Sequence, residues 1–102
     1  MSNPLTVYIS GQVTGLPYKQ AEHNFAEAAA YLYSCNHNPV NPLKIATETD
    51  DARTAMAKLL PEMLKCDAIY MLKDWIYSEG AKVELALAKY VGMHVIFEED
   101  QP

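Results

Sequence analysis

Apolar residues along this chain of 102 residues fall into short β-type runs separated by longer stretches with helical spacing. The short runs are rich in β-branched and aromatic residues and predict strands at Leu5–Ser10, Asp67–Leu72 and His94–Phe97. A further extended piece, Pro39–Pro42, is flanked by prolines and is therefore expected to form only an edge strand.

The longer stretches predict helices at about Lys19–Ser34, Asp51–Lys65 and Ala81–Val91. Pro61 lies inside the second pattern, so we expect that helix to kink or restart there. Gly92 follows the third pattern as a C-terminal cap. The first helix carries one apolar stripe, made of Phe25, Ala28, Ala29, Leu32 and Tyr33.

Strands and helices alternate, which predicts an α/β fold with a parallel sheet covered by helices on both faces. The simplest topology is a small flavodoxin-like or Rossmann-like three-layer domain with about four strands in the order 2-1-3-4. Residues 1–102 are expected to form this single domain. The polar segment Leu43–Asp51 is interpreted either as a mobile flap over a site or as a long connection.

The net charge of −5 and the pI near 5.0 argue against binding a nucleic-acid polymer, which requires a basic face. A small anionic ligand in one local pocket is still compatible with this charge. The N-terminal residues have no signal-peptide pattern, and no apolar stretch reaches the length of a membrane span. We therefore expect a cytoplasmic protein with no membrane partner.

Cysteine and histidine are placed in ways that do not favour metal chemistry. Cys35 and Cys66 are too few for a disulfide framework and lack the close pairing of a zinc site, so both are predicted to be buried reduced thiols. The histidines, His23, His37 and His94, include no pair with ligand spacing. The sequence therefore predicts no metal site and no cofactor.

The strongest candidate site is the strand–loop–helix stretch that contains Ser78 and Glu84. Ligands bind at the carboxyl ends of the strands in open parallel sheets, and a serine at a helix start can hold an anion. An alternative interpretation gives these two residues purely structural roles. Ser78 then caps the helix, and Glu84 is a solvated residue paired with Lys82 or Lys89.

A glycine loop, Gly11–Gly15, follows the first strand and allows a ligand to approach the backbone closely. The parallel topology places this loop beside the one after Asp67–Leu72, so Gly11, Gln12, Ser78 and Glu84 are expected to converge on one pocket. Asp67, at the other end of its strand, is expected to be held by hydrogen bonds in a structural role.

Trp75 and Tyr77 lie in the loop before Ser78. Their rings have three possible roles: they stack on a nucleobase, pack the loop against the fold, or form a subunit contact.

These motifs resemble those of the nucleoside 2-deoxyribosyltransferase-like superfamily. The resemblance is carried by Tyr8–Gly15 and by Cys66–Leu72, followed by the set Trp75, Ser78, Gly80–Ala81 and Glu84–Ala88. The chain looks most like the small bacterial and phage branch of the DUF4406 type, and is similar to 2′-deoxynucleoside 5′-phosphate N-hydrolases. The similarity covers nearly the whole chain apart from Leu43–Asp51.

The resemblance implies an enzyme that cleaves the N-glycosidic bond of a (deoxy)nucleoside 5′-monophosphate, or transfers its sugar. It assigns Glu84 as the nucleophile at C1′ and Tyr8 as its neighbour beside the sugar. The residues it assigns to substrate binding are Ser10, Gly11, Gln12, Gly15, Trp75, Ser78 and Gly80. The implied partners are a small nucleotide or nucleoside and further copies of the chain, as a homodimer or higher homo-oligomer.

The chain also departs from the family pattern. The N-hydrolases have a serine at the position of Gln12 and an arginine at that of Thr14, and many members have an aspartate at that of Leu59. Either another acid such as Glu62 substitutes, or efficient catalysis has been lost. The alternatives to an enzyme are a non-catalytic protein that binds or sequesters nucleotides on the same fold, and a purely structural assembly module.

Overall fold

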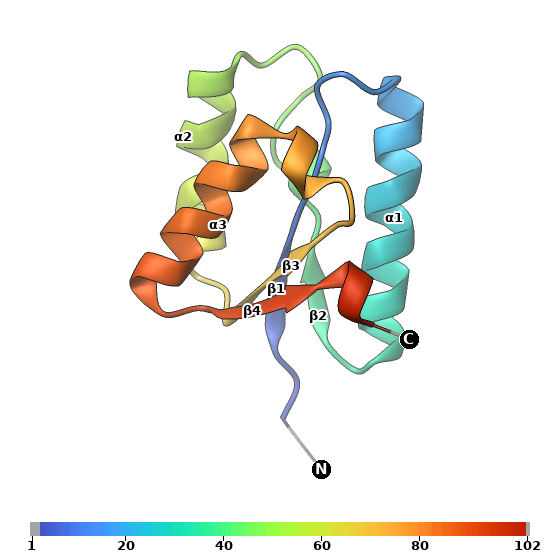
Figure 1. Cartoon of the computed structure of the whole chain (residues 1–102), viewed down its shortest axis with the longest axis vertical. Helices are drawn as coiled ribbons and strands as arrows, with labels where there is room; N and C mark the ends of the chain where they lie inside the picture. Colours follow the sequence, from blue (N-terminus) through green and yellow to red (C-terminus); the bar gives the residue numbers. More distant parts are fainter. Residues whose placement is uncertain (1–2, 102) are drawn as a thin grey trace.

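The computed structural model describes residues 3–101 and contains one four-stranded parallel sheet (Figure 1). The strands are β1 (Thr6–Ser10), β2 (Asn38–Val40), β3 (Ala68–Met71) and β4 (His94–Phe97). Their order is β2-β1-β3-β4, and every neighbouring pair is parallel. The predicted fold class, strand order and edge position of the proline-flanked strand are therefore confirmed.

Helices cover both faces of the sheet (Figure 1). Helix α1 (Tyr18–Ser34) lies on one face, and α2 (Ala52–Met63) and α3 (Glu79–Val91) lie on the other. Successive strand residues point to opposite faces, so β1 contributes to two separate apolar clusters. Short 3₁₀ turns occur in the connections and at the C-terminal end, at Pro42–Lys44, Trp75–Tyr77 and Glu98–Asp100.

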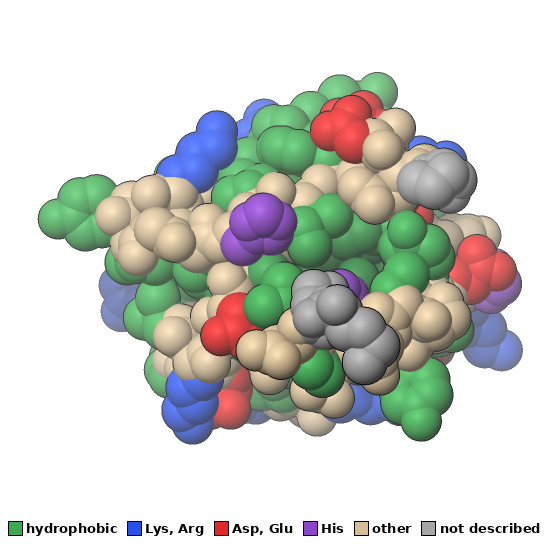
Figure 2. All heavy atoms as spheres, turned by 90° about the horizontal axis from the view of Figure 1, so that it is seen from below, with side chains coloured by type: hydrophobic (Ala, Val, Ile, Leu, Met, Phe, Trp, Pro, Cys, Tyr) green, Lys and Arg blue, Asp and Glu red, His purple; other side chains and the backbone are tan. Residues whose placement is uncertain are grey.

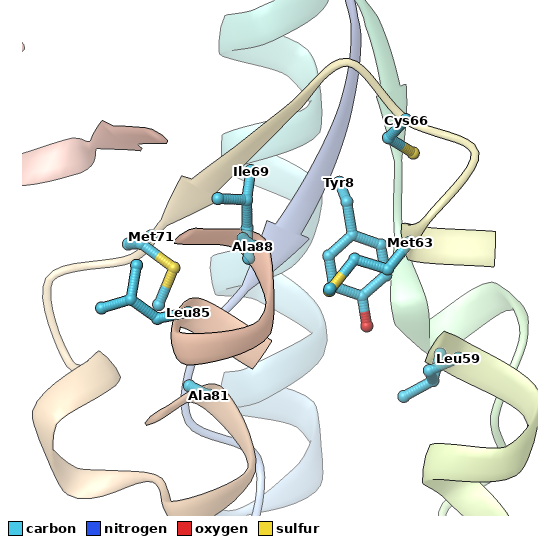
Figure 3. Close-up of a cluster of buried hydrophobic side chains, with 9 residues drawn as sticks. All are labelled: Tyr8, Leu59, Met63, Cys66, Ile69, Met71, Ala81, Leu85 and Ala88. Atoms are coloured by element: carbon cyan, nitrogen blue, oxygen red, sulfur yellow. The ribbon is translucent and has the colours of Figure 1, made fainter. Parts of the chain in front are cut away.

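The two clusters differ in which helices close them. The cluster on the α1 face contains Val7, Ile9, Phe25, Ala28, Leu32, Ala68, Tyr70 and Leu72. The cluster on the α2–α3 face is drawn in Figure 3 and contains Tyr8, Leu59, Met63, Cys66, Ile69, Met71, Ala81, Leu85 and Ala88. Burial of these side chains is the main favourable term that holds the three layers together.

Two local expectations were wrong, and one alternative of a third is excluded. Tyr33 is 75% exposed, because the buried stripe of α1 runs through Phe25 and Leu32 and leaves Tyr33 on the outer side. Cys35 is exposed because it follows the last turn of α1. Helix α2 does not restart at Pro61. The helix continues through Pro61 to Met63, so the missing proline N–H removes one hydrogen bond close to the C-terminal end of α2.

Asp67 immediately precedes β3 and is tied to β1, as predicted. Its carboxylate accepts a hydrogen bond from the Thr6 N–H at 2.9 Å, and its own N–H donates to the Thr6 carbonyl at 2.8 Å. Figure 2 views the molecule from this end, where acidic and basic side chains are scattered rather than gathered in one patch. Within residues 3–101, no helix is both long and apolar enough to cross a membrane.

Candidate functional site

Helix α3 is fixed at both ends and turns Glu84 inward. The Ser78 hydroxyl oxygen accepts a hydrogen bond from the Ala81 N–H at 3.1 Å, and Gly92 ends the helix with a φ of 82°. The buried face of α3 consists of Ala81, Glu84, Leu85 and Ala88. Ser78 is therefore a helix cap, as the structural interpretation predicts, but Glu84 is only 5% exposed and is not a surface residue.

Two hydroxyl groups of β1 hold the Glu84 carboxylate. The Tyr8 hydroxyl donates to Oε2 at 2.8 Å, and the Ser10 hydroxyl donates to Oε1 at 2.6 Å. Tyr8 and Ser10 are two residues apart on a strand, so both face α3, and both are almost completely buried. The predicted pairing of the Glu84 carboxylate with Lys82 or Lys89 is wrong, because Glu84 is buried and the Lys82 ammonium lies 3.5 Å from the carboxylate of the exposed Glu79.

Burial raises the pKa of Glu84, and the hydrogen bonds from Ser10 and Tyr8 oppose that rise. Burial, followed by the nearby Glu84 charge, raises the pKa of Tyr8. Tyr8 therefore keeps its proton and acts as a donor. No ion pair among the described residues includes Glu84. The site is thus a buried carboxylate oriented by two neutral donors, which suits a nucleophile or a base.

Apolar residues enclose this carboxylate site. Leu59 and Met63 of α2 belong to the same cluster as Tyr8, and Figure 3 shows the Tyr8 hydroxyl pointing away from the Cys66 end of the cluster. Ile45 and Ala46 of the connecting segment also pack against this cluster. The segment Leu43–Asp51 therefore lies against the group of side chains that holds the site, and its role as a mobile flap stays a prediction.

The loops after β1 and β3 lie side by side, as expected from the parallel topology. A Cβ atom on Gly11 would come within 2.6 Å of the Leu72 side chain, so the close contact requires glycine. The Gln12 N–H donates to the Asp74 carboxylate at 3.0 Å. Asp74 was not singled out from the sequence. The available signal was an acidic residue in the loop after β3, opposite a glycine loop.

The other predicted ligand-binding residues occupy defined positions near the strand ends. The Gln12 side chain donates to the Thr14 carbonyl at 3.1 Å, and Gly15 has a φ of 95°, which shapes the loop. A Cβ atom on Gly80 would lie 3.2 Å from the terminal methyl of Met56 in α2.

The aromatic residues before α3 have different environments. The ring of Trp75 packs on that of Phe97, with centroids 6.0 Å apart and planes at 46°, which corresponds to the predicted packing role. Tyr77 is 71% exposed.

Two cavities, of about 310 and 260 Å³, lie on the α1 side of the sheet. They share Glu27, Lys73 and Glu98 among their lining residues, and neither includes Ser78 or Glu84. The convergence of Gly11, Gln12, Ser78 and Glu84 on one pocket stays a prediction. The structure brings the two loops together and joins Glu84 to β1, whereas these two cavities open on the opposite face.

Within residues 3–101, no group of three or more His, Cys, Asp or Glu side chains is arranged to hold a metal ion. Cys66 is buried, as predicted, and burial raises the pKa of its thiol, which makes it a weak nucleophile. The candidate chemistry therefore rests on Glu84 and its hydroxyl donors.

The fold and site define a small parallel α/β protein with a buried, doubly hydrogen-bonded carboxylate between its first strand and third helix. A family model described as a domain of unknown function, DUF4406, matches residues 5–97. The chain belongs to this family. No curated protein and no solved structure matches the chain.

Proposed function

We propose that this protein cleaves the N-glycosidic bond of a (deoxy)nucleoside 5′-monophosphate or a related nucleotide, with Glu84 as the nucleophile at C1′. The observation that carries the proposal is the geometry of Glu84, whose two carboxylate oxygens accept hydrogen bonds from Tyr8 and Ser10 inside the fold. The resemblance to the nucleoside 2-deoxyribosyltransferase-like superfamily supplies the reaction class.

Burying a carboxylate costs free energy, because the charge is removed from water, unless hydrogen bonds or an opposite charge compensate that loss fully. The burial of Glu84 therefore calls for a functional explanation. Tyr8 and Ser10 compensate Glu84 through hydrogen bonds but bring no opposite charge. An apolar residue at this position would avoid that cost. A carboxylate that is partly desolvated and held in one orientation is instead favourable for attack on an electrophilic carbon.

The reaction follows the scheme of retaining glycosidases. A Glu84 oxygen attacks C1′, the bond from C1′ to the base nitrogen breaks, and the base leaves with the bonding electron pair. Water then cleaves the glycosyl ester and regenerates the Glu84 carboxylate. Over the complete hydrolysis, water supplies the hydroxyl group on C1′ and the proton on the released base. A second base replaces water in the transfer reaction.

The substrate phosphate is assigned to the Gly11–Gly15 loop and the start of α3. Backbone N–H groups at a helix start favour an anion, and the Ser78 hydroxyl can still donate a hydrogen bond while its oxygen accepts one from Ala81. Gln12 is tied to Asp74, which sets the position of the loop. Trp75, one face of which packs on Phe97, is the candidate for stacking on the base.

Substrate entry requires a movement, because Glu84 is only 5% exposed. The segment Leu43–Asp51 is the element assigned to this movement. Ile45 and Ala46 pack against the site cluster, but the segment consists largely of polar connection outside the sheet. Displacing it would expose the part of the cluster around Tyr8 that Ile45 and Ala46 cover, without breaking a strand pair.

A non-catalytic nucleotide-binding protein is the second candidate, and Leu59 favours it. Leu59 is 9% exposed and packs in the cluster with Tyr8, at the position where the resemblance expects an acid beside the sugar. Glu62, the alternative acid, is partly exposed, and its carboxylate lies 3.0 Å from the Lys65 ammonium. A protein of this kind would bind the nucleotide and leave the glycosidic bond intact.

The test combines binding and chemistry on the same protein. A thermal-shift screen against nucleosides, nucleoside monophosphates and NAD-type ligands should show stabilisation by monophosphates, because ligands that bind the native state raise its melting temperature. Chromatography should then detect free base with wild type and none with Glu84→Gln. Glu22→Gln, which changes an exposed acid of α1, is the matched control and should release base normally.

Three outcomes separate the candidates. Binding with base release that depends on Glu84 supports the enzyme. Binding without base release by wild type supports the second candidate. Absence of any nucleotide effect contradicts both and favours a structural assembly module.

A further inference from the structure

The two cavities on the α1 side of the sheet form a second candidate site. They have volumes of about 310 and 260 Å³ and share the lining residues Glu27, Lys73 and Glu98, so they adjoin each other. The larger cavity is at the lower end of the range that holds small molecules, about 300–1,000 Å³. Figure 1 shows the C-terminal 3₁₀ turn, Glu98–Asp100, beside α1. Helix α1, the end of β3 and this turn thus border one open space.

Tyr70 brings a polar group to the wall of the larger cavity that the fold itself does not use. The residue is only 2% exposed, yet its hydroxyl has no hydrogen-bond partner within residues 3–101. Every fully enclosed side-chain N or O atom in that part of the chain does have a partner. The Tyr70 hydroxyl is therefore not sealed in the core and reaches the cavity that the residue lines. A polar atom left free at this position is available to a ligand.

Acidic side chains predominate around the two cavities. Glu27 and Glu98 line both cavities and Asp74 lines the smaller one, whereas Lys73 is the one basic residue among the described lining residues. Oε1 of Glu98 accepts the Lys73 N–H at 2.8 Å, which leaves the second carboxylate oxygen for another donor. Because the acids outnumber the base, the local charge favours a positively charged ligand.

Two tyrosine rings contribute aromatic surface to the same space. Tyr31 of α1 and Tyr70 of β3 both line the larger cavity, with ring centroids 6.0 Å apart and planes at 31°. Aromatic faces attract cations, and guanidinium groups more often than ammonium groups. Burial, followed by the nearby Glu98 charge, raises the pKa of Tyr70 to about 12. Its hydroxyl is therefore neutral at pH 7 and can accept a hydrogen bond from a ligand N–H.

We propose that the larger α1-side cavity binds a small organic cation with a guanidinium group. The carboxylates of Glu27 and Glu98 balance its charge, the Tyr70 hydroxyl accepts one of its N–H groups, and the two tyrosine rings offer it aromatic faces. A guanidinium has five N–H donors in one plane, so it can reach acceptors on several walls at once. An ammonium group, as a compact point charge, satisfies fewer of them.

This site goes beyond the proposed function. Glu84 meets Tyr8 and Ser10 on the other face of the sheet and lines neither cavity. Cation binding and base release can therefore fail separately. If wild type releases no base but binds the cation through Tyr70 and Glu98, the proposed function alone is contradicted.

The test is calorimetric titration of the whole chain with N-butylguanidinium, and with N-butylurea as an uncharged molecule of similar shape. The charged probe should bind at least about tenfold more tightly than the neutral one, the effect of about one hydrogen bond to a charged group. Glu98→Gln should weaken binding of the charged probe by a similar factor, and its amide oxygen can still accept the Lys73 N–H. Tyr70→Phe should weaken binding about fivefold.

Matched controls separate a local contact from a general change of charge. Glu99→Gln and Glu22→Gln each remove one exposed acid, the first beside Glu98 and the second on α1, and neither residue lines a cavity. Both variants should bind the charged probe as wild type does. Thermal melts should show that all variants are folded, and Tyr70→Phe should melt close to wild type because its hydroxyl has no partner in the described chain.

Four results would overturn the proposal. They are no binding of N-butylguanidinium, equal binding of N-butylurea, binding that Glu98→Gln and Tyr70→Phe leave unchanged, and tighter binding of a capped arginine tripeptide. The last result would assign the cavity to an arginine side chain of a partner protein instead of a free small molecule.

Discussion

The two faces of the central strand β1 are built differently. Toward α1 the strand presents Val7 and Ile9, which pack into a wholly apolar cluster around Phe25. Toward α3 it presents Tyr8 and Ser10, whose hydroxyl groups meet a buried carboxylate. The same five-residue strand thus supports an ordinary core on one side and a polar group of three residues on the other.

This difference distinguishes the apolar packing that the fold requires from the buried Glu84 carboxylate, which the fold does not require. The α1 face shows that apolar side chains are sufficient to attach a helix to this sheet. On the α3 face, Glu84 imposes a desolvation cost that Tyr8 and Ser10 reduce. A costly group retained beside the ligand-binding end of a parallel sheet is characteristic of a functional site.

The largest expected effect on stability is on the apolar face. Phe25→Ala should lower the free energy of unfolding by about 3–5 kcal/mol, because the buried ring is lost and a cavity remains. Denaturant unfolding measures this loss. A loss below about 1 kcal/mol would show that the α1 face can repack and is not a tight core.

A smaller effect is expected on the polar face. Tyr8→Phe removes the donor to Glu84 Oε2 and should destabilise the protein by about 1–3 kcal/mol, since the buried Glu84 side chain loses one of its two hydrogen-bond donors. Tyr70→Phe is the control on the other face, because the Tyr70 side chain lines a cavity there, and it should cost less. Equal costs for the two variants would argue against a special hydrogen bond at Glu84.

Caps give a third comparison, between the starts of two helices on the same face. Ser78→Ala and Asp51→Ala each remove a side chain that accepts an N–H bond, and each should cost about 1 kcal/mol. Only Ser78→Ala should also weaken binding of a nucleoside monophosphate, as measured by calorimetry. If both variants bind the monophosphate as wild type does, Ser78 is a cap and nothing more.

The smallest effect is a gradual dependence of stability on pH. Since burial raises the pKa of Glu84 above its usual 4.5, its contribution is most favourable below that pH and is lost as pH rises through the raised pKa. The stability of wild type minus that of Glu84→Gln should therefore fall as the pH rises above about 4.5 and through the raised pKa of Glu84. Asp50 and Asp51, whose pKa values are lowered, have the opposite trend but are common to both proteins and cancel. A difference that is flat or rises with pH contradicts the prediction.

Much of the fold could be predicted from the sequence, because its strands are short apolar runs bounded by turn residues. His94–Phe97 forms β4 with the predicted bounds, and alternation of strand and helix led to the observed strand order. The continuation of α2 through Pro61 could not be predicted, because it depends on how close the proline is to the helix end.

The site was predictable in part. Strand side chains alternate between the two faces of a sheet, which places Tyr8 and Ser10 on the same face of β1. Helical periodicity places Glu84 on the same face of α3 as Ala81 and Leu85. Which strand residue meets which helix residue depends on packing between the layers, which no local pattern specifies. The contact between Gln12 and Asp74 escaped prediction for the same reason, since it depends on the conformations of two loops.

The central claim is that Glu84 forms a covalent bond to the sugar, and the most direct measurement is the mass of that adduct. A deoxynucleoside monophosphate with fluorine at C2′ should slow both steps, because fluorine destabilises an oxocarbenium-like transition state, and the ester should accumulate. Trypsin cleaves after Lys82 and Lys89, and Glu84 is the sole carboxylate side chain in the resulting peptide 83–89. We predict the sugar-phosphate adduct on that peptide in wild type and its absence in Glu84→Gln. Base release without this adduct, or an adduct on another peptide, would contradict the claim.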